Sequence, residues 1–377
     1  MKRYLVLALL LILTACAMPY RPGQVHREQT SEADPEFPGI IGLASQDQQR
    51  PVDVLLVHGM CSHADSWGAD AINKLIADMK LTEGGVEPYS PEHVDGISLT
   101  RRTVESNVGT IRFVGLVWSS LTKPLKTQLC FDQTTKSKLC EEAGESEAYF
   151  PTRATLNARF KDTLLNDCLA DALIYQGIAR EEIKRRMREA LLAAMGDRPG
   201  DSTDAPLVVI SESLGSKVLF DTLNDMRMEH PSTLAAQAAQ RTVDRLAVLF
   251  MHANQIPILS LAQQGLPAEG VRESQQPEDS LQELLGARSS LPPSVRSRSF
   301  DRLVIVAFTD PNDLLSYVLP RERYETEKVK VVNILVSNAS TLVGKIENPN
   351  TAHRGYSDNP DVPALMGCGM PRSRACR

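Results

Sequence analysis

The chain contains the stretch Pro206-Leu207-Val208-Val209-Ile210-Ser211-Glu212-Ser213-Leu214-Gly215-Ser216, which decides its fold. The four aliphatic residues after the proline are typical of a strand that is buried on both faces of a sheet. Small and polar residues come next, and a helix-forming stretch from Lys217 to Met226 follows. The pattern predicts a sharp strand-to-helix turn with Ser213 at its apex.

The rest of the chain repeats the alternation of short aliphatic runs and helical patterns. We expect helices at about 64–80, 155–196, 214–228 and 278–286, and loops or lid segments at 119–154 and 253–300, which lack periodicity. This order predicts an α/β fold, a doubly wound and mostly parallel sheet of at least six strands. The other expected strands are Val52–Val57, Ile111–Trp118, Leu246–Met251, Leu303–Phe308 and Val329–Val336.

The composition narrows the class of protein. The 377 residues are 42% hydrophobic and 23% charged, which suits a globular protein with a sizeable core. Lys and Arg number 41 against 47 Asp and Glu, a net charge of −6, so we expect no nucleic-acid partner. The one long apolar run is at the N-terminus, which excludes a membrane protein with many spans.

The turn at Ser213 resembles the nucleophile elbow of the α/β-hydrolase superfamily, the fold of many lipases and esterases. A serine on such a strained turn needs small residues two positions before and two positions after it. Gly215 meets this need, and Ser211 stands where the superfamily usually has glycine. The resemblance, which spans about residues 52–360, implies that Ser213 is the nucleophile of a serine hydrolase.

A second part of the resemblance follows the first strand, at Val57-His58-Gly59-Met60-Cys61. In lipases and esterases of this superfamily the strand that enters the oxyanion loop ends in His-Gly. By that match, the backbone N–H groups of Met60 and Leu214 would stabilise the negative oxygen of a tetrahedral acyl intermediate. We expect His58 to have a structural role in orienting the loop.

The superfamily order of nucleophile, acid and histidine implies the remaining two residues. Of the seven histidines, only His353 lies beyond the last expected strand. Two aspartates, Asp310 and Asp313, follow the fifth strand and are both candidates for the acid. The Asn-Asp pair followed by aliphatic residues resembles the acid loop of lipases and favours Asp313, with Asp310 as the alternative.

The resemblance implies a hydrolase that cleaves carboxylic esters, with small-molecule or lipid acyl esters as substrates. The alternative is an inactive protein of the same fold that acts as a binding or scaffold lipoprotein of the cell envelope. We expect no cofactor and no metal, because the chain has no His-Glu-x-x-His motif, dispersed histidines and no glycine-rich nucleotide loop. The oligomeric state stays open.

The N-terminus resembles a bacterial lipoprotein signal. Met1-Lys2-Arg3 is basic, residues 4–13 are apolar, and Leu13-Thr14-Ala15-Cys16 is similar to a lipobox. This implies that residues 1–15 are removed and that Cys16 carries a lipid that binds the membrane. Ala17, rather than aspartate, follows the cysteine, which by the sorting habit of enteric bacteria favours the outer membrane. We expect residues 16–50 to be the lipidated cysteine and a tether, and 51–377 to be the hydrolase domain.

Export to an oxidising compartment would allow disulfides among the six other cysteines. The short spacings favour Cys130 with Cys140 and Cys368 with Cys376, which leaves Cys61 and Cys168 as a third pair. Six cysteines allow 15 pairings, and buried free thiols are the alternative.

Overall fold

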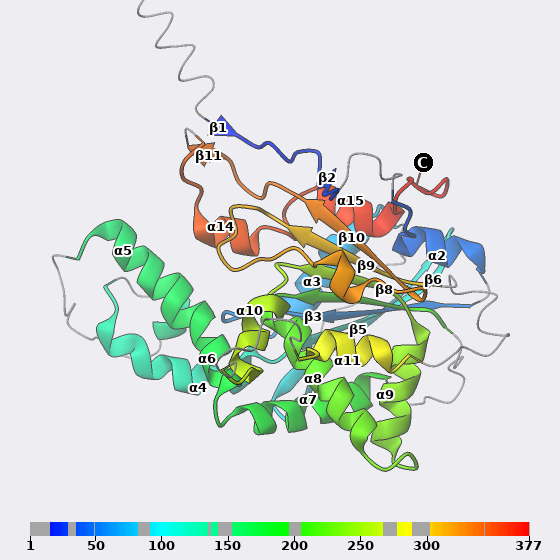
Figure 1. Ribbon diagram of the computed structural model, residues 1–377, viewed down its shortest axis with the longest axis horizontal. Helices are drawn as coiled ribbons and strands as arrows, with labels where there is room; N and C mark the ends of the chain where they lie inside the picture. Colours follow the sequence, from blue (N-terminus) through cyan, green and yellow to red (C-terminus); the bar gives the residue numbers. More distant parts are fainter. Residues whose placement is uncertain are drawn as a thin grey trace, which may run out of the picture.

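A nine-stranded sheet organises the molecule (Figure 1). The structure is a computed structural model that describes residues 16–28, 35–48, 50–81, 91–134, 137–141, 153–195, 205–266, 277–288, 302–342 and 344–376. All six strands that the sequence predicted are present and lie side by side in the middle of the sheet. In spatial order the sheet contains β2 (Gln24–Val25), β10 (Val329–Leu335), β9 (Leu303–Thr309), β8 (Leu246–His252), β7 (Leu207–Glu212), β3 (Val52–Val57), β6 (Gly109–Val117), β5 (Ile97–Ser106) and β4 (Glu92–Val94).

The six central strands are parallel, and the edge strands are antiparallel. The α/β architecture with a mostly parallel sheet is therefore as the sequence predicted. The chain leaves β3 for β6 on one side and then returns to β7 on the other side of β3. In open α/β sheets, ligands bind at the carboxyl ends of strands where the order reverses in this way. Topology alone therefore points to the space beyond β3 and β7.

The sequence did not predict the edge strands β4 and β5. Strand β5 forms a hairpin with β6, and its partly exposed Arg101 and Arg102 interrupt the apolar pattern. An edge strand tolerates such charges because part of it faces solvent. Gly109, with a φ of 124°, begins β6 at the hairpin turn.

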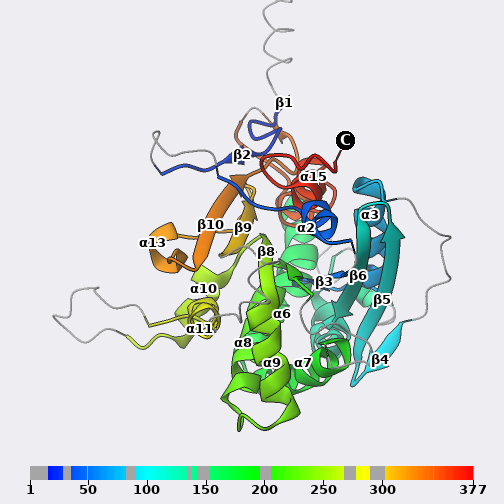
Figure 2. The ribbon, with the colours of Figure 1, turned by 90° about the vertical axis from the view of Figure 1, so that its right-hand side faces the viewer.

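Helices cover both faces of the sheet (Figures 1 and 2). On one face α2, α3 and α15 pack against alternate strand residues such as Val54, Ile210 and Phe308. On the other face α7, α8, α9 and α11 cover Val57, Val209 and their neighbours. Burial on both faces explains why the central strands are almost continuously aliphatic. These helices are α2 (Ile40–Gln46), α3 (Trp67–Asp78), α7 (Arg180–Met195), α8 (Leu214–Met228), α9 (Leu234–Arg245), α11 (Ser280–Gly286) and α15 (Asp361–Cys368).

An insertion between β6 and α7 forms an arm beyond the carboxyl edge of the sheet, at the left of Figure 1. The sequence predicted one helical region over 155–196, but the structure divides it, and Gly177 ends α6. Residues 119–132, expected to be irregular, form short helices. The arm contains η1 (Ser119–Leu121), α4 (Lys123–Lys126), η2 (Thr127–Asp132), η3 (Lys138–Cys140), α5 (Thr155–Phe160), the π-helix η4 (Lys161–Leu169) and α6 (Ala170–Gln176).

The N-terminal segment differs from the expected tether over 16–50. β1 (Cys16–Ala17) pairs with β11 (Thr341–Leu342), β2 pairs with β10, and α2 buries Ile40 and Leu43 against the sheet. The backbone of Phe37 also pairs with that of Met370. The polar composition hid these contacts because the strands are only two residues long and the partners are distant in the sequence. The expected signal peptide, residues 1–15, lies outside the described residues.

The six cysteines other than Cys16 form three disulfides, which are the two pairs that the short spacings favoured and the third pair that remained. Cys130–Cys140 and Cys368–Cys376 close short loops, whereas Cys61–Cys168 joins segments 107 residues apart. Among the described residues, no helix is both long enough and apolar enough to cross a bilayer.

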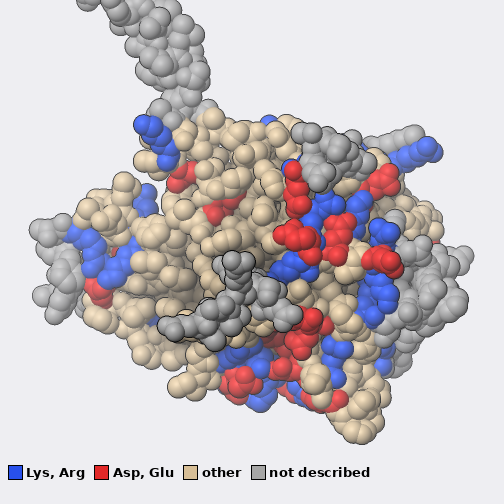
Figure 3. All heavy atoms as spheres, viewed as in Figure 1, with Lys and Arg blue, Asp and Glu red and all other residues tan. Residues whose placement is uncertain are grey.

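The surface in Figure 3 differs between the body and the arm. In the view of Figure 3, acidic and basic side chains are mixed over the right-hand and lower parts of the body. Helix α7 takes part in ion pairs such as Arg185–Glu182 and Arg188–Glu229. The surface where the arm meets the body is largely uncharged. The arm exposes several large apolar side chains, namely Leu125, Phe131, Leu156, Leu165 and Leu173.

Candidate active site

The turn between β7 and α8 has the sharp geometry that the sequence predicted. Ser213 adopts a φ of 50° and a ψ of −128°, a backbone conformation that residues other than glycine rarely adopt. A Cβ at Gly215 would lie 2.1 Å from the carbonyl oxygen of His58, and one at Gly59 would lie 2.9 Å from Cβ of Ser213. Glycine at these two positions lets the turn and the loop after β3 touch.

The hydroxyl of Ser211, the residue at the position where the superfamily usually has glycine, has a hydrogen-bond partner. Its side chain is fully buried and accepts a hydrogen bond from the Ser216 hydroxyl at 2.9 Å. The backbone N–H of Ser213 donates to the carbonyl of His252 at 2.8 Å, which ties the turn to β8. Serine is therefore accommodated at position 211.

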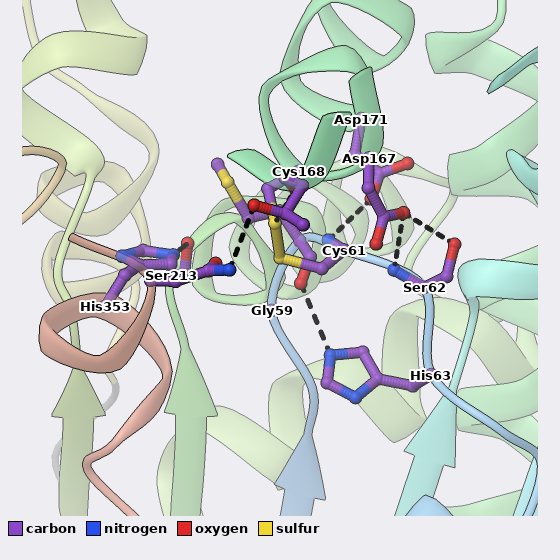
Figure 4. The surroundings of a disulfide bond; sticks show 12 residues. Gly59, Cys61, Ser62, His63, Asp167, Cys168, Asp171, Ser213 and His353 are labelled. Carbon is purple, nitrogen blue, oxygen red and sulfur yellow. Dashed lines mark hydrogen bonds between the residues drawn. A yellow bond between two sulfur atoms is a disulfide. The ribbon is translucent and has the colours of Figure 1, made fainter. Parts of the chain in front are cut away.

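A chain of hydrogen bonds links three of the predicted residues. Ser213 Oγ lies 3.3 Å from His353 Nε2, and His353 Nδ1 lies 3.0 Å from each carboxylate oxygen of Asp313 (Figure 4 shows the serine and the histidine). All three side chains are buried, with exposures of 2%, 6% and 4% for the serine, histidine and aspartate. Because the carboxylate faces Nδ1, the proton of a neutral imidazole lies there, and Nε2 is free to accept the serine proton.

His353 is carried by the short helix α14 (Pro349–Arg354). Asn348 accepts a hydrogen bond from the N–H of Asn350 and so caps this helix. The side chain of Asn338 donates to the carbonyl of Ala352 at 2.7 Å. These contacts fix the start of α14 and its last turn, and with them the position of the imidazole.

Asp310, the alternative acid, is engaged elsewhere. Its carboxylate accepts the backbone N–H groups of Asn312 at 2.9 Å and Asn338 at 2.6 Å. Burial raises the pKa of Asp310, and burial together with the charge of Asp310 raises the pKa of Glu347 to about 7. The structure brings Asp313, and not Asp310, to His353.

Tyr356 is a residue of this site that sequence reasoning missed. Its hydroxyl accepts the N–H of Asp310 at 2.9 Å and donates to Asp313 Oδ2 at 3.0 Å. Burial raises the pKa of this phenol well above its ordinary value, so the hydroxyl keeps its proton. Only the three-residue spacing from His353 hinted at proximity, and the bridge itself depends on the tertiary fold.

Glu212, next to the serine, is also held in place. Its carboxylate accepts a hydrogen bond from the Ser357 hydroxyl at 3.1 Å and lies 3.5 Å from Nδ1 of His252. Burial would raise the pKa of Glu212, but the interactions with His252, His63 and Ser357 together outweigh burial, and the pKa is lowered. An ionised Glu212 thus connects the turn, β8 and the segment after α14.

His58 is a structural residue of the loop after β3. Its Nε2 accepts the N–H groups of Trp118 at 2.8 Å and Ser119 at 3.1 Å, so Nδ1 carries the proton and donates to the carbonyl of Gly59. Burial lowers the pKa of His58 well below 6.5, which keeps the ring neutral. The ring stacks on Trp118, and the loop is thereby fixed to the end of β6.

Met60 and Leu214, whose amides the resemblance assigns to the oxyanion, flank the contact between the loop and the turn. Leu214 begins α8, where the first N–H groups of a helix have no partner within the helix. Met60 follows Gly59 and is 3% exposed. Within the described residues, no group of three or more His, Cys, Asp or Glu side chains is arranged to hold a metal ion.

No protein-family model matches this chain, and no curated protein matches it.

Proposed function

We propose that this chain is a serine hydrolase of the α/β-hydrolase type that cleaves carboxylic esters through an acyl-enzyme. The observation that carries the proposal is the buried chain Ser213–His353–Asp313. It lies at the carboxyl ends of β3 and β7, where the strand order reverses. A protein with only a scaffold role would not need these three side chains within hydrogen-bonding distance of one another.

The mechanism follows from the geometry. Ser213 Oγ attacks the ester carbonyl while His353 Nε2 takes its proton, and Asp313 stabilises the resulting imidazolium. The 3.3 Å separation is within the range expected before a substrate tightens the contact. The imidazolium then protonates the leaving alcohol, which leaves the acyl group on Ser213. A water molecule, deprotonated by the same imidazole, releases the acid and restores the serine.

An oxyanion forms once when the serine is acylated and once when the acyl-enzyme is hydrolysed. In both steps it would accept hydrogen bonds from the amides of Met60 and Leu214. Each such donor is worth roughly 10²–10³ in kcat. The dipole of α8, whose N-terminus follows Ser213 directly, favours negative charge at the same place. Of these two donors, the Met60 amide belongs to the loop after β3, so its position depends on that loop.

Lipid acyl esters are the substrate class that we propose. A lipid on Cys16 would hold the protein at a membrane. Strand β1, which begins at Cys16, pairs with β11, and α14, the helix that carries His353, is the next helix after β11 in the chain. The uncharged surface where the arm meets the body, and the apolar side chains of the arm, suit an acyl chain.

A fluorophosphonate probe tests the proposal, because it labels only a serine that a neighbouring base activates. We expect wild-type protein to be labelled at Ser213 and to hydrolyse p-nitrophenyl esters, with kcat/KM that rises with acyl length. Ser213→Ala should abolish both signals while the melting temperature is retained, whereas Ser211→Ala should keep the label. A folded wild-type protein that is neither labelled nor active would support the scaffold alternative.

We also propose that the protein lies in the bacterial cell envelope and is anchored at the outer membrane through a lipid on Cys16. Expression of Cys16→Ser in a bacterium that processes lipoproteins should give an unacylated protein that leaves the membrane fraction. Metabolic labelling with a fatty-acid analogue measures the acylation directly. An acylated Cys16→Ser variant would contradict the anchor.

A further inference from the structure

The loop after β3 is joined covalently to the arm beside the proposed oxyanion site. The disulfide Cys61–Cys168 connects the residue after Met60 to η4, and both cysteines are fully buried (Figure 4). The other two disulfides join cysteines that are ten and eight positions apart in the sequence, each within one segment. Only this disulfide joins two segments of the site region.

Two carboxylates of the arm hold the same loop. Asp171 Oδ2 accepts the backbone N–H of Cys61 at 2.8 Å. Asp167 Oδ1 accepts both the backbone N–H of Ser62 at 2.9 Å and its hydroxyl at 2.6 Å. The two backbone amides that follow Met60 are therefore both anchored to one face of the arm, as Figure 4 shows.

Lys126 holds the two carboxylates together. Its ammonium is completely buried and donates to Asp167 Oδ1 at 3.0 Å, to the Asp167 carbonyl at 3.1 Å and to Asp171 Oδ2 at 3.0 Å. A buried cation is costly unless it is paired and fully hydrogen-bonded, and these acceptors compensate it. The arm thus carries a buried charge network that is hydrogen-bonded to the loop after β3.

The loop needs external support because its own backbone is strained. Cys61 has a φ of 81°, which is rare for a residue with a side chain. Gly59 touches the nucleophile turn, so a shift of this loop would move the Met60 amide relative to Ser213. Displacements of about 1 Å cost on the order of 10² in rate when they misalign reacting groups.

We propose that the Cys61–Cys168 disulfide and the Asp167–Lys126–Asp171 network position the Met60 amide for the oxyanion, so that the arm is required for turnover. This inference rests on the proposed serine-hydrolase function. The five residues are positioning residues, because they act through the loop and not on the substrate. Their loss lowers kcat, while the affinity for the ester stays unchanged.

The double substitution Cys61→Ala with Cys168→Ala tests the disulfide without leaving a free thiol. We expect kcat to fall about tenfold to hundredfold, as for a displaced oxyanion donor, with KM within twofold of wild type. The pH midpoint of kcat/KM should not move, because the Ser213–His353–Asp313 chain is intact. A trifluoromethyl ketone, which forms the tetrahedral adduct, should lose affinity by the same factor as kcat/KM.

The matched control is Cys130→Ala with Cys140→Ala, which removes a disulfide from the same arm. This variant should keep wild-type kcat at a temperature where circular dichroism shows that both variants are folded. If the two double variants lose kcat equally, or if neither loses it, the positioning role is contradicted.

Asp167 gives a second measurement that does not disturb the disulfide, in case the double variant fails to fold. Asp167→Ala should lower kcat several-fold, and Asp167→Asn should restore part of it, because an amide oxygen still accepts the N–H of Ser62. Equal activity of both variants and wild type would overturn the inference. A wild-type protein without fluorophosphonate labelling would instead overturn the proposed function, so the two failures are distinguishable.

Discussion

The nucleophile turn and the loop after β3 touch each other, yet they are held in different ways. The turn between β7 and α8 obtains its shape from consecutive residues, with Ser211, Ser213 and Gly215 all within five positions. The loop is held by partners 105 to 110 residues away in the arm. A local turn depends on the identity of its own residues, whereas a loop of this kind depends on whether a distant segment folds correctly.

Residues that lie on one local turn have different roles when their partners are distant in the sequence. Asp310 and Asp313 lie on one turn, but only Asp313 contacts His353. We expect Asp313→Asn to lower kcat by about 10⁴, the effect of a wrong imidazole tautomer, with little change in melting temperature. Asp310→Asn should instead lower the free energy of unfolding by about 1–2 kcal/mol, because its carboxylate accepts two backbone N–H groups.

Steady-state kinetics and thermal melts of both variants separate these outcomes. An inactive but normally stable Asp310→Asn would transfer the role of the acid to Asp310.

The contact between the two regions can be broken at Gly215. A Cβ there would lie 2.1 Å from the carbonyl oxygen of His58, so Gly215→Ala must force the turn and the loop apart. We expect a loss of about 1–3 kcal/mol in the free energy of unfolding, typical of an overpacked core, together with a large fall in kcat. Urea denaturation measures the first effect and ester hydrolysis the second.

Gly286 provides the control, since a Cβ at that position has no atom within 4 Å. Gly286→Ala should be close to neutral in both assays. If the two alanine variants behave alike, the close approach of the turn and the loop is unimportant.

Tyr356 tests whether the acid also depends on distant support. The variant Tyr356→Phe keeps the ring and removes the hydroxyl that bridges the Asp310 N–H and the Asp313 carboxylate. We expect kcat to fall roughly tenfold, the loss of a charge-assisted hydrogen bond of about 1.5 kcal/mol. The pH midpoint of kcat/KM should also change, because the carboxylate beside His353 loses a donor. Tyr317→Phe, on the loop that carries Asp313, is a suitable control, and an unchanged pH profile in Tyr356→Phe would contradict the role of the bridge.

The smallest expected effect concerns His58, which ties the loop to β6. Its pKa in the folded protein is lowered by burial, so the unfolded chain binds the proton more readily. The free energy of unfolding should therefore be constant above about pH 6.5 and fall as the pH drops below it, by at most about 1.4 kcal/mol per pH unit. Chemical denaturation between pH 5 and 8 would show this slope.

The variant His58→Gln should be less stable overall but should have a shallower slope than wild type. His230→Gln, at an exposed residue, should keep the wild-type slope. Equal slopes in wild type and His58→Gln would mean that this histidine does not control the pH dependence.

The sequence by itself determined the features that depend on neighbouring residues. The aliphatic runs predicted the six parallel strands because burial on both faces leaves few polar positions. The small residues around Ser213 predicted the turn because its steric demands fall within a few positions of the serine. The short cysteine spacings likewise favoured two of the disulfides.

The tertiary structure decided what depends on segments that are distant along the chain. It packed Ile40 and its neighbours onto the sheet and placed Tyr356 between Asp310 and Asp313. It also set Lys126 between Asp167 and Asp171, beneath the loop that follows β3. Short polar segments carry no periodic signal, and buried charges are stable only with partners that the fold supplies, so these contacts could not be deduced from local pattern.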